Sequence, residues 1–445
     1  MNILGLSITH DGTLSIIQDG VHTFSLAEER VNRIKSYIGF PFKALRYVID
    51  NNIINPDKLD LVAISTSVFL PQWAFTYAFE LTEDKTYFDL QNEKKPSNFF
   101  INCDQFHNIK NESECKQYVK IKIKNLLQNA GIKCPIHFIN HHLSHASSAY
   151  FSSGFKDALA ITMDGEGDSL SASINLCKNG KINTISTTSD KSSAGNLYSE
   201  VTRLCGYKIS RHEGKITGLA AFGNFGQYQA QFDSLVKVSD GKLYYSDSHK
   251  TAREIINPFN SISHKDLAAS IQNLLENKIT EIISYWIDKT GIEQIVLAGG
   301  IFANVKINQY VSQIKRLKNI FVFPNMGDGG NAYGAAAYLY SKKNSHKPKL
   351  FCNPYLGPKF DNKYIYEILD KNKTNVKFYK SNNLEKETAQ LIFNNKIIGW
   401  FQGRMEYGPR ALGNRSILAN PTDSNINEWL NERMHRTEFM PFAPS

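Results

Sequence analysis

Short apolar segments and glycine-containing turns alternate at the start of the chain. Asn2–Ser7 has the apolar character of a β-strand, and Thr13–Ile17 alternates in the manner of a second one. His10-Asp11-Gly12 separates the two segments as a turn, and Asp19-Gly20 ends the second. The pattern predicts a β-hairpin at the N-terminus.

The same pattern returns in the middle of the chain. Ala158–Met163 is an apolar strand, Asp164–Asp168 is an acidic turn with two glycines, and Ser171–Leu176 is a further strand. Asn179-Gly180 ends this second hairpin. One such hairpin in each half indicates an internal duplication.

Strands and helices then alternate. Apolar residues recur at helical spacing over Leu267–Ile287, which predicts a core helix. A strand follows at Gln294–Leu297, then a turn at Gly299-Gly300 and a helix that begins near Asn304. This order of elements is typical of an α/β fold.

A second strand, turn and helix repeat that order. Ile320–Phe323 is the strand, Gly327–Gly330 is a glycine turn, and small residues from Ala332 to Ala337 predict a closely packed helix. The fold class is therefore α/β.

Two segments of different composition suggest the domain organisation. Residues 70–130 are polar and aromatic, and we interpret them as an insertion that ends in a helix. Ser341–Lys349 is basic and polar, as in a linker, and Leu384–Phe393 and Lys396–Phe401 predict a helix and a strand after it. We expect two domains, residues 1–345 and 346–445.

Composition narrows the class of protein. The chain has 445 residues, 42% hydrophobic and 21% charged, with a net charge of +9, which is typical of a globular protein. Positive charge suits anionic small molecules or nucleic acid, but basic runs of the RNA-binding kind are absent, so RNA is the less favoured partner.

Cysteine usage and apolar patterning bear on the compartment. The six cysteines form no CxxC pair, which favours reduced thiols. No basic leader with an apolar core and no apolar stretch of about 20 residues occurs. We expect a cytoplasmic protein that does not enter a membrane.

A histidine pair is the sharpest chemical feature of the sequence. His141 and His145 lie four positions apart, so on a helix both imidazoles face one side and suit a metal such as zinc or iron. Asp164 and Asp328 each sit in a glycine turn after an apolar strand and are the best candidates for oxygen ligands. The alternative is that both histidines make ordinary hydrogen bonds.

Glycine turns and one lysine suggest phosphate binding. Gly299-Gly300 and Gly327–Gly330 each precede a helix, where main-chain N–H groups can face a phosphate or ribose. No P-loop motif exists, so that mode of binding is excluded. Lys215 lies between glycines in Gly214–Gly218 and suits an anion, although such a segment alone is more often a turn.

Three arginines follow the last predicted strand. A glycine-rich stretch of twelve residues contains Arg404, Arg410 and Arg415. Guanidinium groups match the geometry of phosphate. The alternative is a solvated basic loop. The neighbouring glycine, proline and apolar residues favour phosphate binding.

Nine ordered segments resemble the NodU-type O-carbamoyltransferase family. They are SITHDG (7–12), AEERVNRIK (27–35), NHHLSHA (140–146), MDGEGD (163–168), GKITGLA (214–220), GGIFANV (299–305), GDGGNAYGA (327–335), GRMEYGPRALGNRSIL (403–418) and RTEFMPFAPS (436–445). The resemblance covers nearly the whole chain apart from the insertion.

The resemblance implies an architecture of two modules. The first is an actin-like domain (ribonuclease H-like and duplicated), and the second is an α/β YrdC-like domain that forms carbamoyl adenylate. Family members continue past the last of these motifs, so we expect the YrdC-like domain to be incomplete at Ser445.

The resemblance also implies a role for individual residues. His10 would be the general base and Lys35 would contact the carbamoyl intermediate. Divalent iron would be held by His141, His145, Asp164 and Asp328. Nucleotide or carbamoyl contacts would come from Lys215, Gly218, Gly299, Gly300, Asn304, Arg404, Arg410, Asn414 and Arg415.

The expected reaction transfers a carbamoyl group from carbamoyl phosphate, through ATP-derived carbamoyl adenylate, to a hydroxyl of a sugar or natural product. The alternatives are a tRNA-modifying enzyme of the threonylcarbamoyl type and an inactive nucleotide-binding remnant. A sugar kinase is disfavoured because the histidine pair has no role in phosphoryl transfer. A homodimer is an expectation from the family alone.

Overall fold

The computed structural model describes residues 1–68, 111–344, 347–351, 353–422 and 425–434. Contacts divide the chain into two units, Met1–Cys352 and Asn353–Ser445, which we describe separately. Most of the expected insertion lies outside the described residues, as does the last motif, 436–445. The insertion ends in helix α6 (Glu112–Asn129), as predicted.

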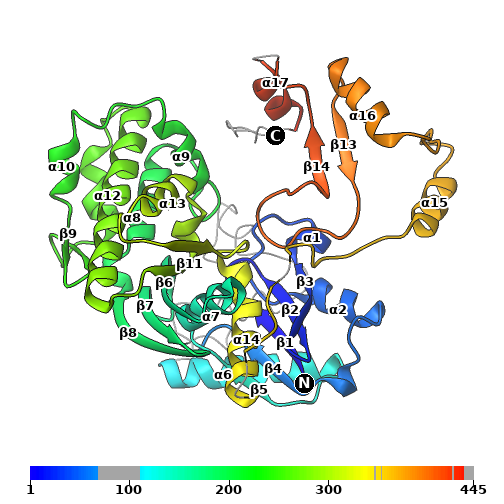
Figure 1. Cartoon of the computed structure of the whole chain (residues 1–445), viewed down its shortest axis with the longest axis horizontal. Helices are drawn as coiled ribbons and strands as arrows, with labels where there is room; N and C mark the ends of the chain where they lie inside the picture. Colours follow the sequence, from blue (N-terminus) through cyan, green and yellow to red (C-terminus); the bar gives the residue numbers. More distant parts are fainter. Residues whose placement is uncertain (69–110, 345–346, 352, 423–424, 435–445) are drawn as a thin grey trace, which may run out of the picture. The chain divides into compact units, whose positions relative to one another are not determined.

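The first half of unit 1 contains a five-stranded sheet. Its strands are β1 (Asn2–Ser7), β2 (Thr13–Gln18), β3 (Val21–Ala27), β4 (Leu61–Ile64) and β5 (Ile136–Phe138). Their order is β3-β2-β1-β4-β5. The first three strands pair antiparallel, and β4 and β5 add in parallel (Figure 1).

The second half repeats this arrangement. Its strands are β6 (Asp157–Gly167), β7 (Leu170–Lys178), β8 (Lys181–Ser189), β11 (Gln294–Ala298) and β12 (Asn319–Val322), in the order β12-β11-β6-β7-β8. β6, β7 and β8 pair antiparallel, and β11 and β12 add in parallel. This is the order of the first sheet, so the predicted duplication and the ribonuclease H-like, actin-like fold are confirmed.

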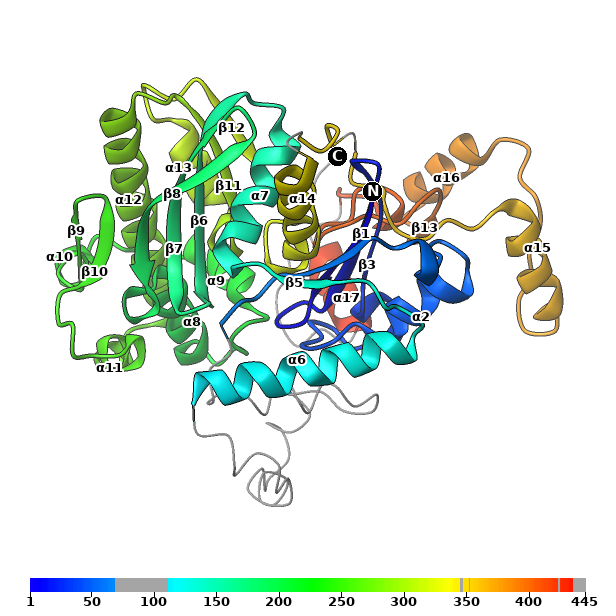
Figure 2. The ribbon, with the colours of Figure 1, turned by 90° about the horizontal axis from the view of Figure 1, so that it is seen from below.

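Each sheet buries one face under helices of its own half. α2 (Phe42–Asp50) and α6 lie beside the first sheet (Figure 2). Their apolar side chains, such as Leu45 and Ile123, are part of its core. α8 (Ala194–Leu204), α12 (His264–Thr290) and α13 (Val305–Ser312) share the core of the second half. The predicted apolar stripe of α12 is confirmed as core.

Shorter elements complete unit 1. They are α1 (Glu29–Asn32), α9 (Glu213–Ala220), α10 (Gln229–Asp233), α11 (Ala252–Ile256), β9 (Val236–Ser239) and β10 (Lys242–Tyr245). The segment around Lys215 is therefore helix α9 rather than the turn that its glycines suggested.

Two helices occupy the space between the sheets. α7 (His141–Ser153) contacts β6 and β11 of the second sheet, and α14 (Asn331–Asn344) contacts β1 and β2 of the first (Figures 1 and 2). The two helices also pack closely against each other. A Cβ atom at Gly334 would lie only 1.9 Å from the carbonyl oxygen of Ser144, so glycine permits this approach.

The structure corrects two boundaries predicted from the sequence. The acidic segment Asp164–Asp168 is not a turn throughout, because β6 continues to Gly167 and the chain reverses at Asp168 and Ser169, with φ of +51° and +64°. Ser341–Lys349 is not a linker throughout, because α14 continues to Asn344. In both places a neighbouring element stabilises backbone that the local residues alone do not specify.

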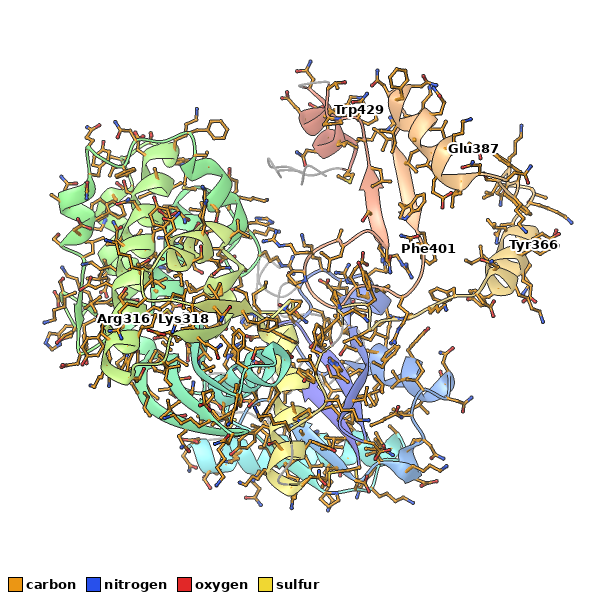
Figure 3. The ribbon with its side chains drawn as sticks, viewed as in Figure 1. Arg316, Lys318, Tyr366, Glu387, Phe401 and Trp429 are labelled. Carbon is orange, nitrogen blue, oxygen red and sulfur yellow. The ribbon has the colours of Figure 1, made fainter. Side chains whose placement is uncertain are left out.

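The described residues of unit 2 contain a small sheet and three helices. Its elements are α15 (Asn362–Lys371), α16 (Leu384–Phe393), β13 (Ile398–Phe401), β14 (Arg415–Leu418) and α17 (Ile426–Arg433), and β13 pairs antiparallel with β14. Tyr366, Phe401 and Trp429 are exposed (Figure 3). No helix among the described residues of either unit is long and apolar enough to cross a membrane.

We predict that Gly334→Ala destabilises unit 1, because the added methyl group meets the main chain of α7. Overpacking of this kind costs about 1–3 kcal/mol of unfolding free energy. Gly214→Ala is the matched control, since a Cβ there meets nothing within 4 Å. Urea denaturation of both variants measures the difference, and equal stabilities would contradict the close packing.

Candidate functional site

Helix α7 begins at the first histidine of the predicted pair. The side chain of Asn140 accepts a hydrogen bond from the N–H of Leu143 at 3.1 Å and so caps the helix. His141 is the first helical residue, and His145 lies one turn further along the same face. The predicted arrangement of this pair is confirmed.

The two predicted aspartates come from the other half of the unit. Asp164 lies near the end of β6, and Asp328 begins a short 3₁₀ turn (Asp328–Gly330) directly before α14. Both carboxylates face the histidine pair. His145 Nε2 lies 3.1 Å from Asp164 Oδ2 and 3.3 Å from Asp328 Oδ1.

The four side chains converge on one small volume. One ligand atom from each lies within 4.8 Å of all the others. His141 Nε2 is 3.1 Å from His145 Nε2, 3.5 Å from Asp328 Oδ1 and 3.7 Å from Asp164 Oδ2. Two imidazole nitrogens and two carboxylate oxygens in this arrangement fit a divalent metal of the borderline class, such as iron or zinc.

The electrostatics of the four residues favour a cation. His141 and His145 are 3% and 0% exposed. Burial alone would lower the pKa of His141, but the carboxylates of Asp328 and Asp164 raise it to about 9. Burial would raise the pKa of Asp164, but hydrogen bonds with His141 and His145 hold it well below its usual value. The site therefore attracts positive charge.

The residues around the four candidate ligands leave little free space. A Cβ at Gly167 would lie 2.1 Å from Cδ2 of His141, and a Cβ at Gly300 would lie 2.9 Å from Oδ1 of Asp164. The predicted nucleotide residue Gly300 thus lies against the carboxylate of Asp164, a candidate metal ligand. Asn331 Nδ2 lies 3.1 Å from His145 Nε2. Sequence reasoning missed Asn331, although it directly follows the glycine turn.

His142 has a structural role between the two predicted ligands. Its Nε2 lies 3.1 Å from the carbonyl oxygen of Leu170, which can only accept, so Nε2 donates and Nδ1 accepts from Thr162 Oγ1 at 2.7 Å. Burial and the neighbouring histidines lower its pKa to about 3. His142 is therefore a neutral link from α7 to β6 and β7.

The predicted general base lies beside an acidic residue that the sequence did not single out. His10 is exposed in the turn between β1 and β2. The next residue, Asp11, keeps part of its surface exposed to solvent. Desolvation and the carboxylates of Asp328 and Glu29 raise its pKa to about 7. Asp11 thus extends the acidic group around Asp328.

A cluster of basic side chains forms around His212. Lys35 comes from the first half of the unit and Lys215 from α9 in the second half, and both act electrostatically on His212. Lys208 and Arg211 add further positive charge there. The structure therefore brings Lys35 and Lys215, which are distant in sequence, to one cationic cluster. His212 and Arg211 were not predicted.

The remaining predicted nucleotide residues of unit 1 have these positions. Gly218 lies within α9, and the N–H of Gly299 donates to the carbonyl of Met326 at 2.7 Å. Asn304 caps α13 by accepting from the N–H groups of Lys306 and Ile307. Its amide nitrogen donates to Gln272 at 2.8 Å, so it is also part of a polar network. Their nucleotide contacts stay a prediction.

Three of the predicted residues of unit 2, Arg404, Arg410 and Asn414, lie in the loop between β13 and β14, and the fourth, Arg415, begins β14. The guanidinium of Arg404 donates to the carbonyls of Leu356 and Gly357. That of Arg415 donates to the carbonyl of Gln402 at 2.5 Å and lies 3.6 Å above the ring of Phe401. These two arginines stabilise the loop.

The other two predicted residues have different surroundings. Asn414 donates to the carbonyl of Arg404 at 2.6 Å, whereas Arg410 is exposed. Glu406, which sequence reasoning missed, accepts from the N–H groups of Leu412, Asn414 and Arg415. The site roles of these residues stay a prediction.

Comparison with known proteins identifies the family. The family described as "Carbamoyltransferase N-terminus" matches residues 2–337, and "Carbamoyltransferase C-terminus" matches residues 389–445. An uncharacterized protein of Synechocystis sp. is 30% identical over 478 residues, which cover 100% of this chain and 75% of the relative.

Two further proteins are similar to the chain. Nodulation protein NolNO of Sinorhizobium fredii is 29% identical over 98% of this chain and 62% of its own length. A solved structure of full-length HypF in the phosphate- and nucleotide-bound form has a TM-score of 0.41 and 14% identity, and covers 77% of this chain and 46% of its own. The resemblance inferred from the motifs is confirmed by the family matches, and the chain belongs to the carbamoyltransferase family.

Proposed function

We propose that the protein transfers a carbamoyl group from carbamoyl phosphate, through ATP-derived carbamoyl adenylate, to a hydroxyl of a small sugar or natural product. The observation that carries this proposal is the convergence of His141, His145, Asp164 and Asp328 in the unit that also holds the cationic cluster. Family membership supports the carbamoyl chemistry.

The four converging side chains would hold divalent iron. When bound, the ion supplies a positive charge that polarises an oxygen of the carbamoyl group. Both carboxylates would be ligands in their ionised form, and both histidines would bind through Nε2. Asn331 would lie at the edge of the metal site from the side of α14, because its Nδ2 approaches the same Nε2 atom of His145 that would bind the ion.

The reaction has two steps. Water hydrolyses carbamoyl phosphate to carbamate and inorganic phosphate, and an oxygen of the carbamate then attacks the α-phosphorus of ATP and displaces pyrophosphate. The acceptor hydroxyl then attacks the carbonyl carbon of carbamoyl adenylate, and AMP leaves with the bonding electron pair. His10 would take the hydroxyl proton, and Lys35 and Lys215 would neutralise charge on the phosphate.

Beside Lys35 and Lys215, His212 would supply a neutral hydrogen-bond donor to a phosphate. The main-chain N–H of Lys208 lies 3.1 Å from Nδ1 of His212, so Nδ1 accepts and Nε2 carries the proton. Desolvation, Lys215 and Lys35 lower the pKa of His212 to about 4. The ring is therefore neutral near pH 7, and its Nε2–H can donate to a phosphate oxygen.

The loop of unit 2 would bind phosphate during adenylation. Arg404, Asn414 and Arg415 would shape the loop, because each donates to main-chain carbonyls. Arg410 would meet the phosphate groups, since it is the exposed arginine of the three.

We predict that His145→Ala weakens Fe²⁺ binding by at least about 100-fold, because it removes a ligand that is fully buried. Anaerobic titration and metal analysis measure the loss. His249→Ala replaces an exposed histidine and serves as the control. Unchanged iron binding in the His145 variant would contradict the metal centre.

We predict ATP–pyrophosphate exchange that depends on carbamoyl phosphate, and a fall of about 10-fold or more in Arg410→Ala, since a charge-assisted contact to phosphate would be lost. Exchange of labelled pyrophosphate into ATP measures the step. Arg316→Ala is the control, because Arg316 (labelled in Figure 3) lies outside the loop of unit 2 and makes an exposed ion pair with Asp288. Exchange without carbamoyl phosphate would refute the adenylation step.

We predict that His212→Asn reduces the acid sensitivity of the fold. The folded-state pKa is about 4 and the ordinary value is 6.5, so the unfolded chain takes up the proton first as the pH falls. Wild-type stability therefore decreases between about pH 6.5 and 4, and the variant lacks this contribution. Thermal unfolding at pH 7 and pH 5 measures it, and identical pH dependence would contradict the assignment.

A further inference from the structure

The carboxylate of Asp168 joins two segments that are distant in sequence. Asp168 lies at the reversal between β6 and β7, with φ of +51°, a conformation that aspartate adopts more readily than most residues. Its two oxygens accept hydrogen bonds from residues 66–68, after β4, and from residues 140–141, at the start of α7. None of these contacts was predicted from the sequence.

The segment after β4 supplies four donors. Thr66 Oγ1 and Ser67 Oγ lie 2.7 and 2.9 Å from the carboxylate. The main-chain N–H groups of Ser67 and Val68 each lie 3.1 Å from it. A carboxylate with this many donors has a well-defined orientation, because its lone pairs are largely used.

The start of α7 supplies the other donors. The main-chain N–H of His141 lies 2.8 Å from Asp168 Oδ2, and Asn140 Nδ2 lies 3.1 Å from the same oxygen. The first N–H groups of a helix have no partner within the helix, and a negative charge is favourable there. Asp168 therefore holds the first turn of α7, on which His141 lies.

The same reversal also contacts the imidazole ring of His141. A Cβ at Gly167 would lie 2.1 Å from Cδ2 of His141, so the main chain at Gly167 packs directly on that ring. The reversal thus restrains His141 twice, at its ring through Gly167 and at its main chain through Asp168. His145, one turn further along α7, is 0% exposed and is restrained by the packing around it.

We propose that Asp168 is a positioning residue of the metal centre, which sets where the Nε2 atom of His141 lies relative to the other three ligands. The inference rests on the metal site of the proposed function. Loss of the carboxylate lets the first turn of α7 move, and His141 then no longer meets the metal in the geometry that His145, Asp164 and Asp328 define.

The test is a Co²⁺ titration of the full chain, because Co²⁺ substitutes for iron and its visible absorption reports ligand geometry. Asp168→Asn keeps the shape of the side chain but places an amide NH₂ group against some of the six donors. We expect Co²⁺ binding about 10–100-fold weaker and an altered absorption spectrum. The matched control is Asp240→Asn, at an exposed hairpin reversal with φ of +51°.

The outcomes separate the inference from the metal proposal. Wild-type affinity and an unchanged spectrum in Asp168→Asn, with only a lowered melting temperature, would show a purely structural role and overturn the inference. Absence of Co²⁺ binding in the wild-type protein would overturn both. If Asp168→Asn does not fold, Thr66→Val decides instead: a 2- to 5-fold weaker affinity supports the inference, and an unchanged affinity refutes it.

Discussion

The close approach of α7 and α14 is the constraint on which the candidate site depends. Gly334 allows the two helices to meet, and each helix begins at the same place between the two sheets. His141 is the first residue of α7, and Asp328 lies directly before α14. The two equivalent helices of a duplicated fold therefore bring candidate ligands from both halves to one point, and neither half alone contains all four.

That geometry also explains why carboxylates are tolerated in a largely buried place. Main-chain N–H groups at helix starts favour nearby negative charge, and the same carboxylates raise the pKa of His141 to about 9. A helix start also favours negative charge outside the group of four residues, where Asp168 accepts a hydrogen bond from the first N–H of α7. Acidic residues lie at the start of both central helices, so the acidic character of the site is a consequence of the fold.

Much of the fold and of the candidate metal site could be predicted from the sequence, because the residue patterns that indicate them are local. The spacing of His141 and His145 specifies one face of a helix, and Asp164 and Asp328 each follow an apolar strand. Asp11, Asn331 and His212 could not be predicted in the same way. Each gains its role from residues more than a hundred positions away, as Asp11 does from Asp328 and His212 from Lys35.

The arginines of unit 2 show where residue type alone is insufficient. Three guanidinium groups in a glycine-rich segment predict phosphate binding, but two of them donate to carbonyls of their own unit. A loop rich in glycine exposes main-chain carbonyls, and arginine is the side chain best suited to bind several at once. Several arginines close together in a sequence can therefore indicate either a structured loop or an anion site. Arg404 and Arg415 take the structural role, because their guanidinium groups donate to carbonyls of the same unit, and the anion role that the arginine density predicts stays a prediction.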